Sequence, residues 1–189
     1  MYRGAASRLI LLPLMLCVAA CATPVATPRT GTDPPSLFLT VPFLDQEDRL
    51  CGPASLAAVL HYWQNKTGRP ETPLSEITRA TFLPALGGAL GADLARFARG
   101  AGFAAAPYSG DLADLRAHLA DDRPPIVFLN LGYRRFPAGH FVVVTGIDVR
   151  GVIAHSGAQP NAHFAYDDFM AAWAKTDYWT LTLRPKDSS

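Results

Sequence analysis

The fold of this chain is decided by the run Gln46-Glu47-Asp48-Arg49-Leu50-Cys51-Gly52-Pro53-Ala54, in which a polar stretch leads directly to a cysteine. The apolar stretch from Ser55 to Trp63 predicts a buried helix that begins near this cysteine, with Pro53 in its first turn. Far downstream, Gly139-His140-Phe141-Val142-Val143-Val144 predicts a histidine at the start of a buried strand. A thiol at a helix start, an upstream amide and a strand histidine are the parts of a cysteine nucleophile site.

The N-terminus predicts an export signal. Arg3 and Arg8 supply its positive start, and the apolar stretch that follows is too short for an ordinary membrane span. It ends in Val18-Ala19-Ala20-Cys21, which resembles the bacterial lipobox, so we expect Cys21 to be acylated. The alternative is an ordinary secretory signal in which Cys21 is incidental. Ala22 stands where an Asp would resemble an inner-membrane retention signal, so we expect a lipid anchor in the outer membrane, facing the periplasm.

The composition predicts one globular domain with an N-terminal extension. The chain has 189 residues, 49% of them hydrophobic, which suffices for a sizeable core. We expect the signal over residues 1–20 and the domain over residues 37–184, followed by a tail at 185–189. Residues 21–36 are rich in proline and threonine, which predicts a tether rather than packed structure.

The charge and the motifs argue against nucleic acid and nucleotide partners. The formal net charge is +1, and removal of the export signal with its two arginines lowers it to −1. A domain without a basic excess lacks the electrostatic footprint of a nucleic-acid binder. The glycines within residues 87–91 lack the context of a dinucleotide site, and the sequence has no P-loop. The sequence therefore implies no nucleotide, no other cofactor and no metal.

The hydrophobic pattern predicts helices in the first half of the domain and strands in the second. Helices are expected over residues 51–65, 73–81, 92–99, 111–121 and 167–175, with Asp111 as a cap. Strands are expected over residues 37–41, 125–131, 141–148, 152–156 and 178–183, with a tight turn at Arg150-Gly151. This order predicts an α+β domain in which N-terminal helices pack on a C-terminal antiparallel sheet.

Cys51 is the candidate nucleophile. Cys17 lies within the export signal and Cys21 is expected to be acylated, so Cys51 is the remaining free thiol of the mature chain. The unsatisfied N–H groups and the positive dipole end of a helix N-terminus favour the reactive thiolate. A buried and inert cysteine is the alternative, but the polar run before Cys51 and the Gly-Pro after it argue against burial.

His140 is the candidate base. It follows the loop Pro137-Ala138-Gly139 and precedes a continuous apolar run, which places it at the mouth of a rigid strand. The other histidines are expected elsewhere: His61 lies about 15 Å along the helix from Cys51, His118 on an exposed helix face, His163 in a polar loop, and His155 at a strand end, either solvated or supporting the site.

Gln46 is the candidate oxyanion donor. It lies five residues before Cys51 in a loop that can fold back, so that its side-chain amide and the Cys51 backbone N–H converge on one point. A solvated loop glutamine is the alternative.

Together these residues resemble the papain-like cysteine peptidases, specifically the bacteriocin-processing double-glycine peptidases (family 39 of the cysteine peptidases) and their stand-alone relatives. The matching segments are Val41-Pro42-Phe43 leading to Gln46, residues 51–57 and residues 139–146. The resemblance covers about residues 37–184 and implies a papain-like α+β fold. It also implies Cys51 as nucleophile, His140 as general base and acid, Gln46 as oxyanion donor, and a peptide or an exported protein as substrate.

The sequence departs from this family at the residue that orients the histidine. Members carry an Asp or Asn about sixteen positions after the histidine, where this chain has Ser156. Asp148 lies at the wrong end of the His140 strand, roughly 26 Å away at ~3.3 Å per residue. A hairpin would bring back Ser156, Gln159 or Asn161, and a one-residue register shift decides which of them faces His140. The amide of Asn161 suits the role best chemically, but the choice stays open.

Three functions remain open at this point. The first is a lipid-anchored cysteine peptidase of the bacterial cell envelope. The second is a cell-wall amidohydrolase or acyltransferase that uses the same Cys-His pair. The third is a catalytically silent papain-like binding module, in which the turn at Cys51 serves packing alone. Rapid alkylation of Cys51 below neutral pH would argue against the third.

Overall fold

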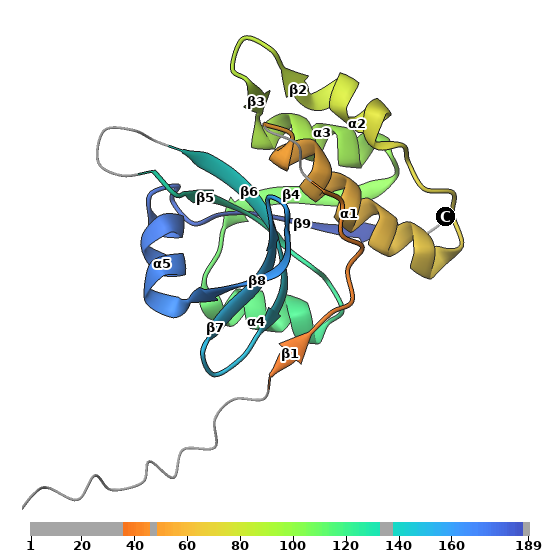
Figure 1. Cartoon of the computed structure of the whole chain (residues 1–189). Coiled ribbons are helices and arrows are strands. Elements are labelled where there is room, and N and C mark those ends of the chain that lie inside the picture. Colours follow the sequence, from red (N-terminus) through yellow and green to blue (C-terminus); the bar gives the residue numbers. More distant parts are fainter. Residues whose placement is uncertain (1–35, 46–48, 133–137, 187–189) are drawn as a thin grey trace, which may run out of the picture. The chain divides into compact units, whose positions relative to one another are not determined.

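The computed structural model describes residues 36–45, 49–132 and 138–186 of the chain (Figure 1). Within these residues the domain is α+β, as predicted. Its helices are α1 (Cys51–Thr67), α2 (Leu74–Thr81), α3 (Gly91–Gly100), α4 (Leu112–Ala120) and α5 (Tyr166–Ala174). Its strands are β1 (Leu37–Phe38), β2 (Phe82–Leu83), β3 (Gly88–Ala89), β4 (Phe103–Ser109), β5 (Ile126–Asn130), β6 (Gly139–Ile147), β7 (Gly151–Ser156), β8 (Gln159–Ala165) and β9 (Trp179–Pro185).

An antiparallel sheet forms the centre of the domain. Its strand order is β4-β9-β5-β6-β7-β8, and β1 pairs with the far end of β6. Strand β6 is buried from Phe141 to Ile147, which explains its nearly continuous apolar sequence. Strand β6 lies between β5 and β7: its first residues, Gly139 and His140, pair with β5, and the pairing with β7 begins at Val143.

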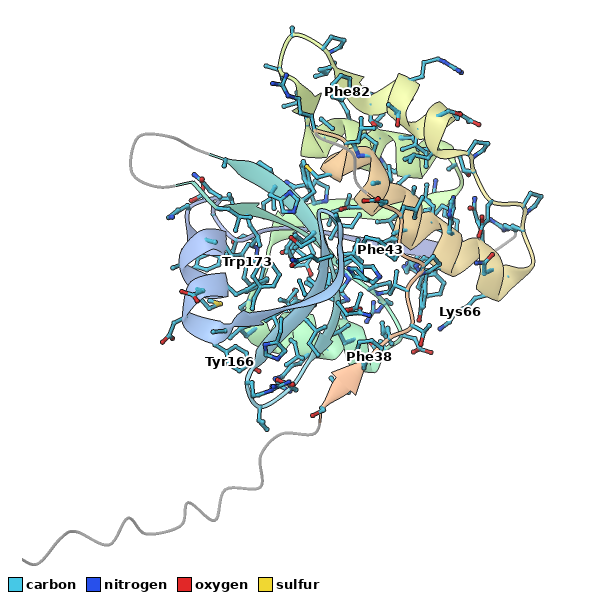
Figure 2. The ribbon with its side chains drawn as sticks, viewed as in Figure 1. Phe38, Phe43, Lys66, Phe82, Tyr166 and Trp173 are labelled. Atoms are coloured by element: carbon cyan, nitrogen blue, oxygen red, sulfur yellow. The ribbon has the colours of Figure 1, made fainter. Side chains whose placement is uncertain are left out.

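Helices cover both faces of this sheet. Figure 1 shows α1, α2 and α3 grouped on one side and α5 on the opposite side. Helix α1 is buried from Gly52 to Tyr62, so it runs as a core helix and not as an amphipathic surface helix. On the other face, the fully buried Trp173 of α5 donates its Nε1–H to the carbonyl of Trp179 in β9 at 3.1 Å (Figure 2). The packing fixes α1 and the sheet against each other.

The turn between β6 and β7 follows the prediction. The Asp148 carboxylate accepts hydrogen bonds from the backbone N–H of Arg150 at 2.7 Å and of Gly151 at 3.0 Å. The hairpin expected around Arg150-Gly151 is therefore confirmed. These bonds hold the pKa of Asp148 down to about 2. Asp148 stabilises this turn, which lies at the opposite end of β6 from His140.

Four strands depart from the sequence predictions: the two-residue strands β2 and β3, and the longer strands β4 and β8. Strand β4 was not expected, because its alanines and Pro107 have low strand propensity; it pairs along its whole length with β9. Strand β8 lies where a polar loop was expected around His163, and that expectation is wrong: β8 pairs with β7. Polar residues along a strand at the sheet edge give no hydrophobic alternation, so the sequence signal is absent.

Within the described residues, no helix combines the length and the hydrophobicity needed to cross a membrane.

Candidate active site

A cavity of about 500 Å³ brings Cys51 and His140 together. The two residues are far apart in sequence and come from different elements, the start of α1 and the start of β6. Residues 86–90, which span the tip of the β2–β3 hairpin and β3, form one wall, and Phe128 of β5 contributes to another. Arg49 also lines the cavity. Cys51 and His140, the two residues that the sequence predicts to act together, therefore line the same cavity.

Cys51 is the first residue of α1. The helix starts without a side-chain cap, and the first intrahelical bond runs from the Ala54 N–H to the Leu50 carbonyl at 2.9 Å. The N–H groups of Cys51 and Gly52 precede this bond and belong to the set that a helix leaves unsatisfied at its N-terminus. They are available, with the helix dipole, to stabilise negative charge beside the thiol.

Gly52 allows the other walls to approach the nucleophile. A Cβ at this position would lie 2.9 Å from the Cβ of Ala89 and 3.3 Å from the ring of Phe141. Real Cβ atoms essentially never show a contact as short as the one to Ala89, so a side chain here would push β3 away from α1. The glycine in the Cys51-Gly52-Pro53 sequence is therefore required for packing around the thiol as well as for access to it.

His140 is fixed by its neighbours in the sheet. It pairs with Leu129 of β5, and the next residue, Phe141, packs on Phe128 with ring centroids 4.4 Å apart. The imidazole is partly buried, and desolvation lowers the pKa of His140 below its usual value of 6.5. Lowering this pKa keeps the ring neutral at neutral pH, which is the state a general base needs.

Among the described residues, Ser156 contacts the imidazole of His140. Its hydroxyl oxygen lies 3.0 Å from Nε2 of His140, at the end of β7 and before a turn in which Gly157 has a φ of +58°. Of the three residues that the sequence left open, Asn161 is engaged elsewhere, because its side-chain oxygen accepts a hydrogen bond from the Thr145 hydroxyl at 2.9 Å. Gln159 is exposed. The histidine thus has a hydroxyl partner where the family resemblance implies a carboxylate or an amide.

The remaining histidines have other partners. His155 is buried: its Nε2 lies 3.0 Å from the carbonyl of Val41, its Nδ1 accepts the Asn161 N–H, and Phe43 packs edge-on against its ring (Figure 2). His61 bonds the carbonyl of Thr72. His118, expected on an exposed face, is instead largely buried against Tyr108 and Asp114, and His163 pairs with Asp148.

Two predicted site residues lie outside the described residues: Gln46, the candidate oxyanion donor, and Cys21, the candidate lipidation site. The sequence reasoning, in turn, missed the wall formed by residues 86–90 and the charge of Arg49. Gly87-Gly88 is the available sequence signal for that wall, since it marks a turn, but nothing in it points to the cysteine.

A second hollow adjoins the first. It has a volume of about 430 Å³, shares Phe128 and Gly139 with the Cys51 cavity, and extends to Lys175 and Asp177 after α5. Asn130 lies at its edge and accepts hydrogen bonds from the backbone N–H groups of Gly132 and Ala138, at 3.0 and 3.1 Å. These bonds tie together the two ends of the β5–β6 connection directly before His140.

The fold matches solved structures of C39 peptidase domains. A double-glycine motif protease from an AMS/PCAT transporter, in complex with a leader peptide, has a TM-score of 0.62 at 22% identity, covering 79% of this chain and 94% of that one. The peptidase domain of Streptococcus ComA has a TM-score of 0.60 at 20% identity, covering 78% and 100%. A C39-like peptidase from Bacillus anthracis has a TM-score of 0.65 at 15% identity, covering 82% and 100%. These likenesses confirm the predicted papain-like α+β fold.

A search of the curated proteins finds no match. The family model described as the Peptidase_C39 like family, in contrast, matches residues 38–182 and so takes in α1, the central sheet and both Cys51 and His140. This chain therefore belongs to the Peptidase_C39 like family.

Proposed function

We propose that this protein is an active cysteine peptidase in which Cys51 is the nucleophile and His140 the general base and acid. One observation carries the proposal. Cys51 and His140 line a single cavity, and the Ser156 hydroxyl is hydrogen-bonded to Nε2 of the His140 imidazole. A histidine held by one nitrogen beside a helix-terminal thiol is the arrangement that nucleophilic acyl transfer needs.

Each step uses a named group. In the tautomer that acts as base, the His140 Nε2–H donates to the Ser156 hydroxyl, and the Nδ1 lone pair accepts the Cys51 thiol proton. The sulfur attacks the peptide carbonyl carbon, and the resulting oxyanion is stabilised by the N–H groups at the start of α1 together with the Gln46 amide. His140 then protonates the leaving amine as the C–N bond breaks. Water, deprotonated by His140, releases the acyl group from Cys51.

The proposed substrate is a peptide or an exported protein. The Cys51 cavity and the adjoining hollow share Phe128 and Gly139, so they are neighbours, and we propose that an extended peptide occupies both. The similar AMS/PCAT protease was solved in complex with a leader peptide, which supports a peptide substrate here.

The proposed location is the bacterial cell envelope, with the domain facing the periplasm. Support comes from the sequence: an export signal ends in Val18-Ala19-Ala20-Cys21, and a Pro- and Thr-rich segment separates Cys21 from the domain. Acylation at Cys21 would anchor the chain in the outer membrane.

The test is proteolysis by the purified full chain. Incubation with a mixed synthetic peptide pool, followed by mass spectrometry, should reveal products cut at defined bonds, and Cys51→Ser should produce none. A parallel incubation with purified peptidoglycan separates a peptidase from a cell-wall amidohydrolase. Absence of peptide cleavage by the wild-type chain, with Cys51 freely alkylated, would show that the site is accessible but not a peptidase site.

A further inference from the structure

Arg49 gives the Cys51 cavity its charge. Of the described side chains that line this cavity, Arg49 alone carries a fixed charge, since the other lining residues are apolar or glycine apart from Cys51 and the partly buried His140. A guanidinium remains protonated at every physiological pH. No carboxylate among the described residues lines the cavity to neutralise it. The described part of the hollow therefore presents a positive charge with no opposing carboxylate.

The backbone and the hairpin hold Arg49 in this position. Its φ is +75°, a conformation that residues with side chains rarely adopt, and it lies two residues before the nucleophile. Its side chain extends to the tip of the β2–β3 hairpin: a Cβ on Gly87 would lie 3.0 Å from Nη1 of Arg49. The guanidinium thus lies at the tip of the β2–β3 hairpin, in the lining of the Cys51 cavity.

We propose that Arg49 selects substrates that carry a carboxylate close to the scissile bond. This inference rests on the proposed peptidase function and adds the substrate chemistry. Arg49 is exposed, and a guanidinium binds a carboxylate through two parallel N–H···O bonds, which adds geometric specificity to the attraction between the charges. The carboxylate can belong to an Asp or Glu side chain or to the C-terminus of a peptide, and the experiment separates the two.

Peptide pools test the preference directly. Two pools of short synthetic peptides differ only in that one contains Asp and Glu where the other contains Asn and Gln, and each is made with a free and with an amidated C-terminus. We expect kcat/KM for the full chain to be about tenfold higher for the carboxylate-bearing peptides. The preference should shrink at about 1 M salt, where the screening length falls to about 3 Å. A dependence on the free C-terminus alone identifies the terminal carboxylate.

Reversing the charge of Arg49 distinguishes a role in substrate recognition from a role in supporting the β2–β3 hairpin. Arg49→Glu should invert the preference, so that peptides with Lys in place of Glu become the better substrates, whereas Arg49→Lys should retain most of it. Arg184→Glu is the matched control, because Arg184 is exposed on β9 and lines a separate hollow. If Arg49→Glu lowered the cleavage rate of all peptides equally, Arg49 would only support the hairpin, and the inference would be overturned.

Alkylation of Cys51 tests the same charge without proteolysis. Iodoacetate and iodoacetamide both react with the thiolate, which displaces iodide, and both rates are measured on the Cys51 peptide. The rate with iodoacetate divided by the rate with iodoacetamide does not depend on the amount of thiolate. This ratio therefore reports the electrostatic potential near Cys51. Arg49→Gln should lower this ratio by about threefold to tenfold, and Arg184→Glu should leave it unchanged. A falling ratio without peptide turnover would refute the peptidase but support the carboxylate site; an unchanged ratio overturns the inference.

Discussion

Replacing Ser156 by Asp tests how this site differs from one with a carboxylate partner for the histidine. Ser156 Oγ lies 3.0 Å from Nε2 of His140, so the Asp carboxylate falls within the range of about 4–6 Å at which an opposite charge shifts a pKa by about 1–3. The variant should raise the pKa of His140 by that amount, which corresponds to about 1.4–4 kcal/mol in favour of the imidazolium.

The assay is an NMR titration of the His140 ring protons in a Cys51→Ala background, where no thiol titrates beside it. In the otherwise unchanged protein, His140 should titrate below its usual value of 6.5, because burial disfavours the charged ring. Ser156→Asp should titrate higher, and Ser156→Asn, which adds no charge, should stay close to the unchanged protein. In the active enzyme, the acid limb of kcat/KM should lie below 6.5 and move to higher pH in Ser156→Asp, because the base is lost as pH falls through its pKa.

The reasoning is refuted if His140 titrates above 6.5 with Ser156 in place. It is equally refuted if Ser156→Asp leaves the titration unchanged while the fold is intact, since the hydroxyl would then not face the imidazole in solution.

Three further predictions concern the other proposed roles. His140→Ala should abolish peptide cleavage with unchanged circular dichroism. His163→Ala changes an exposed strand residue paired with Asp148 and should keep nearly full activity; equal loss in both would mean that His140 is not the specific base. Gln46→Ala should lower kcat by about 10²–10³ with little change in KM, because the oxyanion bond forms mainly in the transition state; full kcat would remove Gln46 from the mechanism. Cys21→Ser should move the protein from the membrane to the soluble fraction or leave it unprocessed, as fractionation with blotting would show, and normal processing with unchanged retention would argue against acylation.

The sequence predicts the part of the fold that contains the nucleophile. Helix α1 was expected to begin at Cys51, and it does, because a polar run, Gly-Pro and a long apolar stretch all indicate the same boundary. Strand β6 was equally clear, since a strand buried on both faces has a continuous apolar sequence. The local signals and the tertiary packing agree in both elements.

The partner of His140 could not be chosen from the sequence, for a physical reason. The pairing of β6 with β7 shifts register between Val144 and Gly146, and that of β7 with β8 shifts between Ala154 and Ser156. Each shift changes which side chains share a face of the sheet. The isolated Gly146 within a strand is a sequence signal for the first shift, but the residue types between Ala154 and Ser156 give no signal for the second. The register of the paired strands therefore decides that Ser156 and not Asn161 faces the imidazole.

A hydroxyl partner for His140 affects how readily the Cys51 thiol is oxidised, and this leads to a last prediction. A carboxylate beside the imidazole favours the thiolate–imidazolium pair, and peroxide attacks the thiolate rather than the thiol. Ser156 supplies orientation without that charge, so the site should expose less thiolate between turnovers than an Asp-containing one. Ser156→Asp should therefore speed the oxidation of Cys51 by hydrogen peroxide near neutral pH, by about tenfold for each unit that the pKa of His140 rises while the ion pair stays the minor form. Mass spectrometry of the Cys51 peptide after timed exposure measures this rate, with Ser156→Asn as the uncharged control. Equal oxidation rates in the Asp and Asn variants would show that the His140 partner does not govern the state of the thiol.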